Sequence, residues 1–374
     1  MHISDIVDPH RSAGTRTTFG TRNRLKLGLF GANLAGIGMT AVPERWMADW
    51  DANVAVAQMA EEAGLDFLLP VARWKGYGGT TDPQGTSLET ITWATALLAL
   101  TRRITVFATV HVPLINPVLA AKQCVTADHV GKGRFGLNIV CGWNDDEFQM
   151  FGVPRSQETR YEYAREWLDA VKDIWARTDT FDVEGRHIRL HGVRAMPKPY
   201  GDSRPLLLNA GQSPEGTAFA LDNCDVLFSA PPGRDPSKLA PTIDRIRTAA
   251  DKPHFPIFTA CVVICRESRQ EAEEFQQYCT EHADEEAVNN LLSAKQRSGR
   301  AIPAGELDAV RRDVAKATAV YLVGSADDVA AQLEHMHSSG ANGVAMMFTN
   351  QLQELPFFNA QVLPRLERMG LRSA

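Results

Sequence analysis

The sequence predicts an α/β fold, a TIM (β/α)8 barrel with insertions at the C-terminal face. Short apolar runs alternate with longer amphipathic segments along the chain. Apolar runs that are buried on both faces and separated by helices are typical of parallel βα units. Eight such units close into a barrel. The runs span 25–30, 66–71, 104–110, 135–140, 206–209, 225–228, 257–265 and 343–348.

The segments between these runs have helical patterns. In residues 51–63, four apolar side chains follow the i, i+3, i+4, i+7 spacing of an amphipathic helix, and Gly64 supplies a C-terminal stop. Residues 117–130 predict another helix. Ser325, followed by Asp328 three residues later, is typical of a helix cap before the last unit.

Three stretches exceed the usual short connections and are interpreted as insertions on the barrel, at about 141–158, 181–203 and 283–316. The second contains FDVEGRHIRL, which predicts a small hairpin around Glu184 and Gly185. The third is rich in lysine and arginine. It is either a solvated helical excursion or a mobile lid over the active site.

Composition indicates an ordinary globular protein, with 374 residues, 44% hydrophobic and 22% charged, and a net charge of −6. We expect an N-terminal extension over 1–24 and a single barrel domain over 25–374. The basic residues are dispersed, which argues against nucleic acid as a partner. The first 24 residues lack an apolar core, and no 18-residue apolar run follows, so we expect a cytoplasmic protein without membrane spans.

No metal site is predicted. His335 and His337 are two apart on a helical pattern and cannot face one ion together. His187 and His191 lack the acidic companion of the H-E-x-x-H motif. The six cysteines are scattered without C-x-x-C pairs and are expected to be reduced, packed thiols.

The glycines of GKGRFG at 131–136 spell G-x-G-x-x-G, the pattern of a dinucleotide fingerprint. That fingerprint needs a strand before the glycines and a helix after them. Here the predicted helix precedes the glycines and the predicted strand follows them. The pattern is therefore interpreted as a turn.

Residues 133–147, GRFGLNIVCGWNDDE, carry the strongest functional signal, because a buried strand leads directly into a polar loop. Loops at the carboxyl ends of barrel strands converge on one mouth, where cofactors bind. A planar, anionic cofactor needs an amide or hydroxyl near its ring edge, an apolar wall, and donors for its phosphate. The candidates are Thr109, Asn138, Glu147, Arg160, Tyr161 and Gly211-Gln212-Ser213, with Ser213 at a helix start suited to phosphate.

At these residues the chain resembles the bacterial luciferase-like family of flavin-dependent monooxygenases, most closely its pyrimidine monooxygenase branch. The likeness covers roughly residues 25 to 365. It is carried by ARWKGYGG at 72–79, RFGLNIVCGWNDDEFQMFG at 134–152, Arg160-Tyr161, NAGQS at 209–213, ADEEA at 283–287 and LVGS at 322–325.

The resemblance implies a barrel that binds FMN at its C-terminal mouth and uses O2 as co-substrate. Reduced FMN would come from a separate NAD(P)H:flavin reductase. One oxygen atom would be transferred to a small, pyrimidine-like heterocycle through a flavin-peroxide or N5-oxide, and the substrate would be cleaved. The resemblance also implies a homo-oligomer, a dimer or tetramer.

Particular residues take roles from the same resemblance. Thr109, Asn138 and Val140 match the positions that hold O2 beside the flavin. Three alternatives stay open. Thr109 could simply cap the sheet, and Glu147 could form a surface ion pair with Arg160. Tyr161 could be a packing aromatic. The implied cofactor contacts are Ala72, Arg73, Asn138, Glu147, Arg160, Tyr161 and Ser213, with Gly211 in the loop leading to Ser213.

His111 lies two residues beyond Thr109 and should point to the same side of the strand. It could border the substrate as an acid or base, or be structural. Histidine at this position departs from the pyrimidine branch and leaves the substrate open. Trp74, Lys75 and Trp143 are further pocket candidates.

Three rival functions are retained. A sulfone or alkanesulfonate monooxygenase that breaks a carbon–sulfur bond would need an anion-binding arginine, for which Arg297 or Arg300 could serve. A deazaflavin-dependent hydride-transfer enzyme could use the same barrel. A catalytically silent flavin-binding protein is disfavoured by the presence of Thr109 and Asn138.

Overall fold

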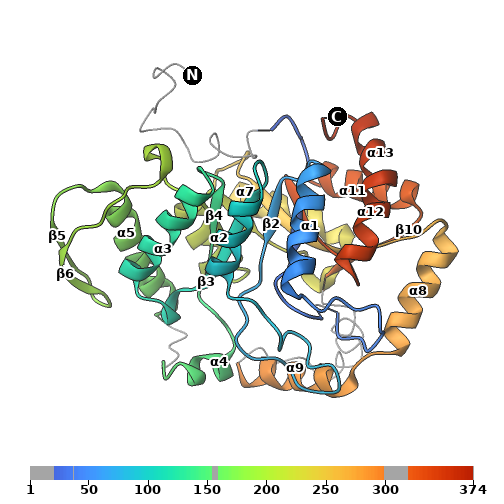
Figure 1. Cartoon of the computed structure of the whole chain (residues 1–374), viewed down its shortest axis with the longest axis horizontal. Coiled ribbons are helices and arrows are strands. Elements are labelled where there is room, and N and C mark those ends of the chain that lie inside the picture. The colour runs from blue at the N-terminus through green and yellow to red at the C-terminus, as the bar shows by residue number, and fades with distance from the viewer. Residues whose placement is uncertain (1–20, 37, 154–158, 299–318, 374) are drawn as a thin grey trace.

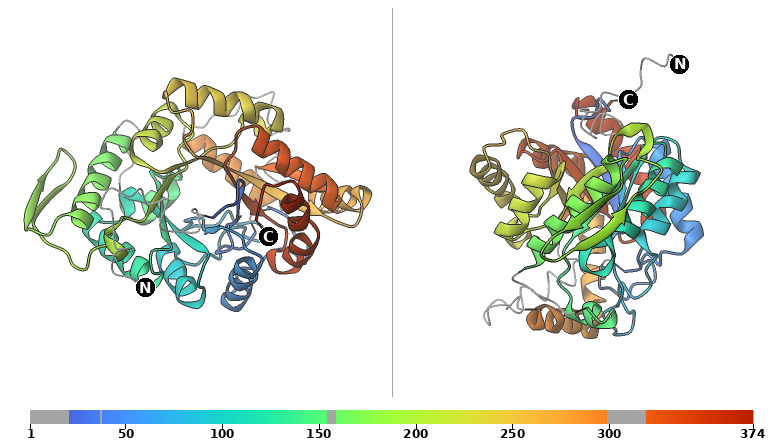
Figure 2. Two further views of the ribbon diagram at one scale, coloured as in Figure 1. Left: turned by 90° about the horizontal axis from the view of Figure 1, so that it is seen from above. Right: turned by 90° about the vertical axis from the view of Figure 1, so that its left-hand side faces the viewer.

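The computed structural model describes residues 21–36, 38–153, 159–298 and 319–373. Eight parallel strands close into a barrel, because β9 pairs with β8 on one side and with β11 on the other. Seen from above, the strands lie inside a layer of helices (Figure 2). The predicted TIM barrel and its eight apolar runs are confirmed. The strands are β1 (Lys26–Phe30), β2 (Phe67–Leu69), β3 (Thr105–His111), β4 (Phe135–Val140), β7 (Leu206–Asn209), β8 (Val226–Phe228), β9 (Ile257–Cys265) and β11 (Gly343–Met347).

The outer helices follow the strands, as the sequence predicts for βα units. The predicted helix at 51–63 is α1, and the one at 117–130 is α3. Ser325 and Asp328 form the predicted capping box at the start of α11. The outer helices are α1 (Trp50–Glu62), α2 (Thr90–Leu100), α3 (Pro117–Val130), α5 (Arg160–Ala176), α6 (Pro214–Asn223), α7 (Leu239–Ala249), α11 (Ala326–Ser338), α12 (Gln351–Gln361) and α13 (Leu363–Arg368).

A further strand, β10 (Val320–Gly324), was not among the predicted runs. It pairs with the second half of β9, from Cys261 to Cys265. β9 has nine residues, and only its first half is needed to close the barrel. The remaining backbone groups of β9 are satisfied by this extra strand.

The stretches predicted as insertions contain a hairpin and two helices. The predicted hairpin is present as β5 (Phe181–Glu184) and β6 (Arg189–Val193), and it projects from the barrel (Figure 1). The first insertion contains α4 (Asp145–Met150), and the third follows α8 (Arg269–Glu281) and contains α9 (Glu285–Arg297). α4 packs beside α9 at the end of the barrel opposite α13 (Figure 1). The remainder of the predicted lid, 299–316, lies outside the described residues.

Aromatic rings fill the barrel interior below the mouth. Phe67 packs against Phe107 and Phe258, with ring centroids 6.3 and 5.3 Å apart. Strand glycines make room for the rings, since a Cβ at Gly136 would lie 2.4 Å from the Phe107 ring, and one at Gly343 would lie 2.7 Å from Phe258. The polar groups at the strand ends therefore stand above an apolar floor.

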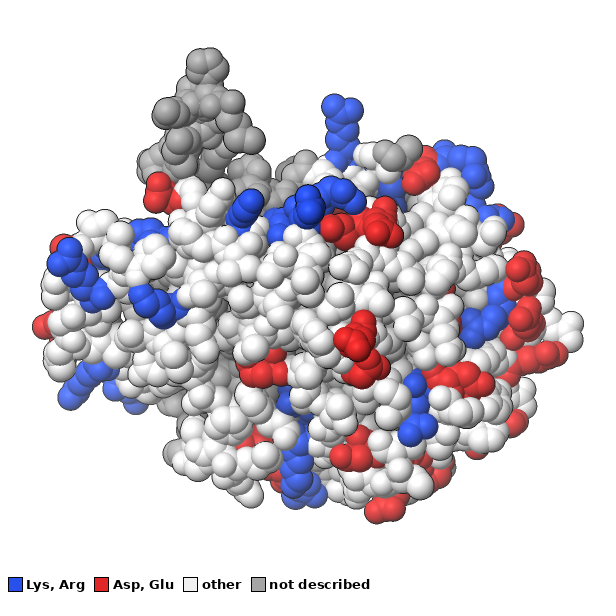
Figure 3. Space-filling view, viewed as in Figure 1, with Lys and Arg blue, Asp and Glu red and all other residues white. Residues whose placement is uncertain are grey.

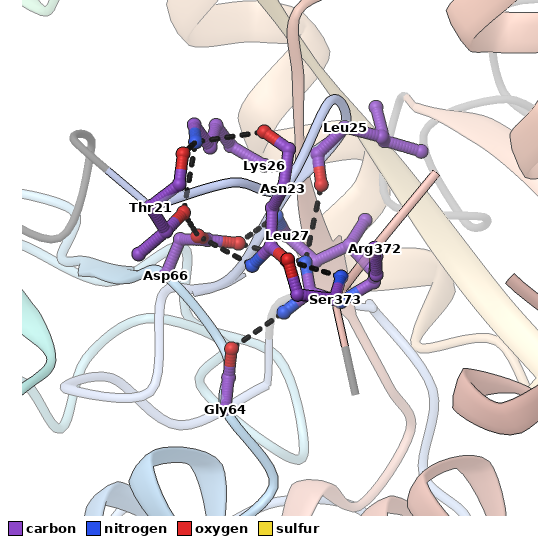
Figure 4. A network of polar contacts seen from close by, with 9 residues as sticks. All are labelled: Thr21, Asn23, Leu25, Lys26, Leu27, Gly64, Asp66, Arg372 and Ser373. Atoms are coloured by element: carbon purple, nitrogen blue, oxygen red, sulfur yellow. Dashed lines mark hydrogen bonds and ion pairs between the residues drawn. The ribbon is translucent and has the colours of Figure 1, made fainter. Parts of the chain in front are cut away.

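A buried polar cluster closes the end of the barrel opposite the mouth, where β1 and β2 begin (Figure 4). The Asp66 carboxylate accepts hydrogen bonds from the Asn23 side chain at 2.9 Å, the Leu27 amide at 2.9 Å and Arg372 at 2.7 Å. Thr21 also donates to Asp66, at 3.0 Å. Two residues of the predicted 1–24 extension thus join the barrel, while residues 1–20 lie outside the described chain.

The surface carries mixed charge. On the face shown in Figure 3, acidic and basic side chains are interspersed and form no basic stripe. None of the helices in the described ranges has the length and apolar character that a membrane-spanning helix requires.

Candidate active site

The predicted catalytic residues lie in two layers at the ends of β3 and β4. Parallel pairing places Thr109 beside Asn138, and His111 beside Val140 one layer nearer the mouth. A cavity of about 280 Å³ opens above them. Its lining includes the predicted residues Ala72, Arg73, Thr109, His111, Asn138, Val140, Arg160, Tyr161, Gly211 and Ser213, and also Trp143.

Thr109 and Asn138 form a buried relay. The Thr109 hydroxyl lies 2.6 Å from the carbonyl oxygen of Pro70, so it must donate its proton there. Its oxygen accepts from Asn138 Nδ2 at 3.1 Å. Asn138 Oδ1 is buried and has no hydrogen-bond partner in the described chain. Since unpartnered buried oxygens are costly, Oδ1 is suited to accept from a bound ligand.

His111 is a neutral imidazole at the rim of this cavity. Burial lowers the pKa of His111 to about 4, and the charge of Glu147 only partly opposes this shift. Its buried Nδ1 has no hydrogen-bond partner among the described residues. Neutral imidazole offers one donor and one acceptor nitrogen to a ligand.

Arg73 lines the cavity and is held there by Glu147. The two side chains form a buried ion pair at 3.2 Å, and Glu147 also accepts from the Trp74 amide at 2.8 Å. The Arg73 guanidinium lies 5.4 Å from the centroid of the Tyr77 ring and 5.7 Å from that of Trp143. These contacts hold the guanidinium in one position.

Glu147 is paired with a residue that lines the cavity. Its buried carboxylate contacts Arg73, so the alternative of a surface pair with Arg160 is wrong. α4 begins just before Glu147 and turns the carboxylate inward. Glu147 thus positions Arg73, and its expected contact with the cofactor stays a prediction.

Other pocket candidates point elsewhere. Asp146 pairs with Lys75 at 3.3 Å and with Arg297 at 3.0 Å, so both cations lie on the outside of α4. Trp74 packs its exposed ring against Phe151. Arg300 lies outside the described residues.

The far end of the cavity is built for an anion. Ser213 caps α6, and its hydroxyl accepts from the Gly216 amide at 3.1 Å. Asn209 holds the preceding loop, because its Oδ1 accepts from the Gly211 amide at 2.7 Å. The dipole at a helix start favours a phosphate. Glu215 also hydrogen-bonds the Ser213 side chain at this start. Arg160 lines the same end of the cavity.

Tyr161 links this loop to α5. Its hydroxyl hydrogen-bonds the Ser213 side chain, and burial raises the pKa of Tyr161. Its ring packs on Phe219 with centroids 5.8 Å apart. Tyr161 is thus a packing aromatic through its ring, and its hydroxyl also contacts Ser213 at the start of α6.

A second cavity of about 270 Å³ adjoins the first. The two share Phe30, Val71, Arg73, Ala210 and Gln212. Sequence reasoning missed this cavity. The ends of the predicted runs 25–30 and 225–228 could have pointed to two of its walls. Residues found in the second cavity alone include Met39, Gln84, Phe228, Arg234, Leu291 and Met347.

The cysteines behave as packed thiols where they are buried. Cys141 lines the first cavity, but burial raises the pKa of its thiol to about 12. A thiol with this pKa carries little thiolate near neutral pH and is a poor nucleophile. Within the described ranges, no three His, Cys, Asp or Glu side chains converge as metal ligands.

Known proteins share this architecture. The family model described as luciferase-like monooxygenase matches residues 27–343. Pyrimidine monooxygenase RutA of Pseudomonas syringae pv. syringae is 32% identical over 331 residues, which cover 86% of this chain and 90% of RutA.

Solved structures agree in fold. The structure of riboflavin lyase RcaE with modified FMN and riboflavin has a TM-score of 0.82 at 21% identity, covering 94% of this chain and 93% of that chain. DmoA of Hyphomicrobium sulfonivorans has a TM-score of 0.81 at 19% identity, covering 94% of this chain and 90% of DmoA. At these identities the likeness bears on the fold alone.

Proposed function

This chain belongs to the luciferase-like monooxygenase family, and we propose that it uses reduced FMN and O2 to oxygenate and cleave a small, pyrimidine-like heterocycle. Membership makes it a flavin-dependent monooxygenase. The proposal rests on one observation. A single cavity has the oriented amide of Asn138 at one end and the Ser213-capped start of α6 at the other. This spacing of groups suits a planar ring that carries a phosphate.

The residues present fit FMN. Arg160, the Ser213 hydroxyl and the amides at the start of α6 would hold the phosphate. The unpartnered Asn138 Oδ1 would accept a hydrogen bond from a donor on the ring edge. When bound, reduced FMN supplies the electrons that activate O2.

Side chains at the ends of β3 and β4 shape the part of the cavity where the reaction would take place. Thr109 fixes the orientation of the Asn138 amide, and Val140 presents an apolar surface one layer above. The Phe67 and Phe107 rings below exclude water from the barrel interior. Oriented amides in a dry site stabilise developing charge more strongly than they would in water.

Two features support a pyrimidine-like substrate. The second cavity adjoins the proposed flavin site and presents arginine and amide side chains between apolar walls. RutA, which is 32% identical to this chain, is named a pyrimidine monooxygenase. A heterocycle with ring carbonyls would suit such a cavity.

The partners belong to the proposal as well. A separate flavin reductase would supply reduced FMN. The glycines of residues 131–136 lie between α3 and β4, the reverse of a dinucleotide fingerprint, so they do not provide a nicotinamide site. A homo-oligomer remains a prediction.

A second candidate is cleavage of a carbon–sulfur bond. Arg234 lines the second cavity and is a cation that a sulfonate could approach. Arg297, which the sequence suggested for this role, is paired with Asp146 outside the cavity. The two candidates differ in substrate and share the cofactor site.

The test measures product formation with labelled O2. Photoreduced FMN is mixed with the enzyme, 18O2 and uracil, dimethyl sulfone or methanesulfonate, and products are identified by mass spectrometry. We expect one labelled oxygen in a ring-opened uracil product, and loss of that product in Asn138→Ala with FMN binding retained. Asn223→Ala, at the far end of α6, is the control.

Labelled product from a sulfur compound alone would favour the second candidate. Tight binding of a deazaflavin without binding of FMN would overturn both.

A further inference from the structure

We propose that Gln84 determines substrate specificity by donating its side-chain amide N–H groups to an oxygen of the substrate in the second cavity. The inference rests on the proposed function, because it places the substrate beside the flavin site. It assigns to that cavity a class of ligand, a small molecule that presents oxygen hydrogen-bond acceptors.

The orientation of the Gln84 amide is set by Arg73. Arg73 Nε donates to Gln84 Oε1 at 2.9 Å. Arginine has only donors, so the atom facing it must be the carbonyl oxygen of the amide. Nε2 then carries both N–H groups away from Arg73. Gln84 lines the second cavity and makes no other side-chain hydrogen bond within the described chain.

Arg73 is itself immobile, so the orientation persists. The Glu147 carboxylate holds its guanidinium at 3.2 Å, and both groups are buried. A chain of three polar side chains thus runs from Glu147 through Arg73, which lines both cavities, to Gln84, which lines the second. Preorganised donors of this kind discriminate between ligands more sharply than mobile ones.

The backbone of Gln84 is held in an unfavourable conformation. Its φ is +65°, a region that residues other than glycine rarely adopt. The Gln84 amide donates to the Ala35 carbonyl at 2.7 Å, and the Asp82 carbonyl accepts from Gly85 at 2.9 Å. Strain of this kind persists where surrounding contacts impose it, and it concentrates at binding sites.

The rest of the cavity matches the same ligand class. Its polar side chains are Arg73, Gln84, Gln212 and Arg234, and no Asp or Glu is among its described lining residues. Phe30 and Phe228 lie 5.5 Å apart, centroid to centroid, and form an apolar wall. Such a cavity favours carbonyl or anionic oxygens over amino groups.

The test exploits a near-isosteric change. Gln84→Glu keeps an oxygen for Arg73 and the size of the side chain, but it replaces the donating N–H groups with a second acceptor. Binding of two probes to the FMN-loaded protein is followed by perturbation of the flavin spectrum. Uracil presents ring oxygens, and 2,4-diaminopyrimidine presents amino groups at the same positions.

We expect the wild-type protein to prefer uracil. In Gln84→Glu, uracil binding should weaken by about tenfold to a hundredfold, as expected for a lost hydrogen bond replaced by a buried acceptor. The affinity for 2,4-diaminopyrimidine should rise, and FMN affinity should stay within about twofold. Gln353→Glu, an exposed residue of α12, carries the same charge change and should alter none of these values.

Unchanged uracil affinity in Gln84→Glu would overturn the inference, and so would a parallel loss of FMN affinity. If the wild-type protein binds dimethyl sulfone or methanesulfonate in place of uracil, the same variant must weaken that ligand by the same factor. The pyrimidine proposal would then fail while this inference stands. If the FMN-loaded wild-type protein bound neither uracil, dimethyl sulfone nor methanesulfonate, the inference about Gln84 would be overturned.

Discussion

The side-chain amide of Asn138 donates to the hydroxyl of Thr109 across 3.1 Å, and that hydroxyl is itself committed to the Pro70 carbonyl at 2.6 Å. Thr109 consequently has no proton to offer a ligand. The sequence suggested that both side chains hold O2. The structure adds that Thr109 orients the Asn138 amide, whose Oδ1 is buried and has no partner within the described chain; the contact with O2 stays a prediction.

The relay makes Thr109 a positioning residue. Thr109→Val keeps the shape but removes the acceptor for Asn138 Nδ2, which would leave buried polar groups unpaired. We expect oxygenation in a single-turnover assay to slow by about tenfold to a hundredfold, the effect of a lost buried hydrogen bond of about 1–3 kcal/mol. The FMN dissociation constant should stay within about twofold. Thr109→Ser, which retains the hydroxyl, should recover most of the rate, and a fully active Thr109→Val would contradict the relay.

The start of α6 should recognise the phosphate and not the ring. Arg160→Met removes a cation from that end of the cavity, and we expect FMN to bind about tenfold more weakly at low ionic strength. Riboflavin, which has no phosphate, is the internal control, and its affinity should not change. Fluorescence quenching measures both ligands. An equal loss of affinity for FMN and riboflavin would show that Arg160 does not bind the phosphate.

Much of this site could be predicted, and the reasons for the misses are physical. Thr109, Asn138, Arg160 and Ser213 lie at strand ends and a helix start, and the topology of a barrel brings such positions together. The pairing of Glu147 with Arg73 was missed because the direction of its side chain depends on α4, a short helix within an insertion.

Gln84 and β10 were missed for a related reason. Both depend on contacts between segments that are distant in the sequence, and no local periodicity reports such contacts. The fold could therefore be predicted more completely than the second cavity.

His111 should make stability depend on pH. Its pKa is lowered from 6.5 to about 4 by burial. As the pH falls below about 6.5, His111 binds a proton in the unfolded chain, but in the folded chain it stays neutral until about pH 4. The folded state should thus lose about 3 kcal/mol of stability over this interval and keep that contribution at neutral pH.

Urea unfolding at pH 7 and pH 4.5 measures this loss. His111→Gln cannot bind the proton, so its stability should fall less than that of the wild type over the same range. The difference between the two proteins removes the contribution of the other titrating groups. Parallel losses would show that His111 is not the group responsible.

The Asp66–Arg372 pair should be a major determinant of stability. Both side chains are buried, and Arg372 also donates to the Leu25 carbonyl at 3.1 Å and to Gly64. Arg372→Met would leave a buried carboxylate without its cation, which typically costs about 3–5 kcal/mol. Urea unfolding should detect this cost. Arg177→Met, which removes the exposed pair with Asp179, should cost much less stability than Arg372→Met.

A double-mutant cycle separates the pair from the packing around it. Asp66→Asn with Arg372→Met leaves neither charge unpaired, so the double variant should be more stable than the sum of the single costs implies, with a coupling of at least about 1 kcal/mol. Because the cluster closes the end of the barrel opposite the cavity, the folded variants should bind FMN with the affinity of the wild type. Additive costs would mean that the carboxylate is satisfied by Thr21, Asn23 and the Leu27 amide without Arg372. Weakened FMN binding would mean that the two ends of the barrel are coupled.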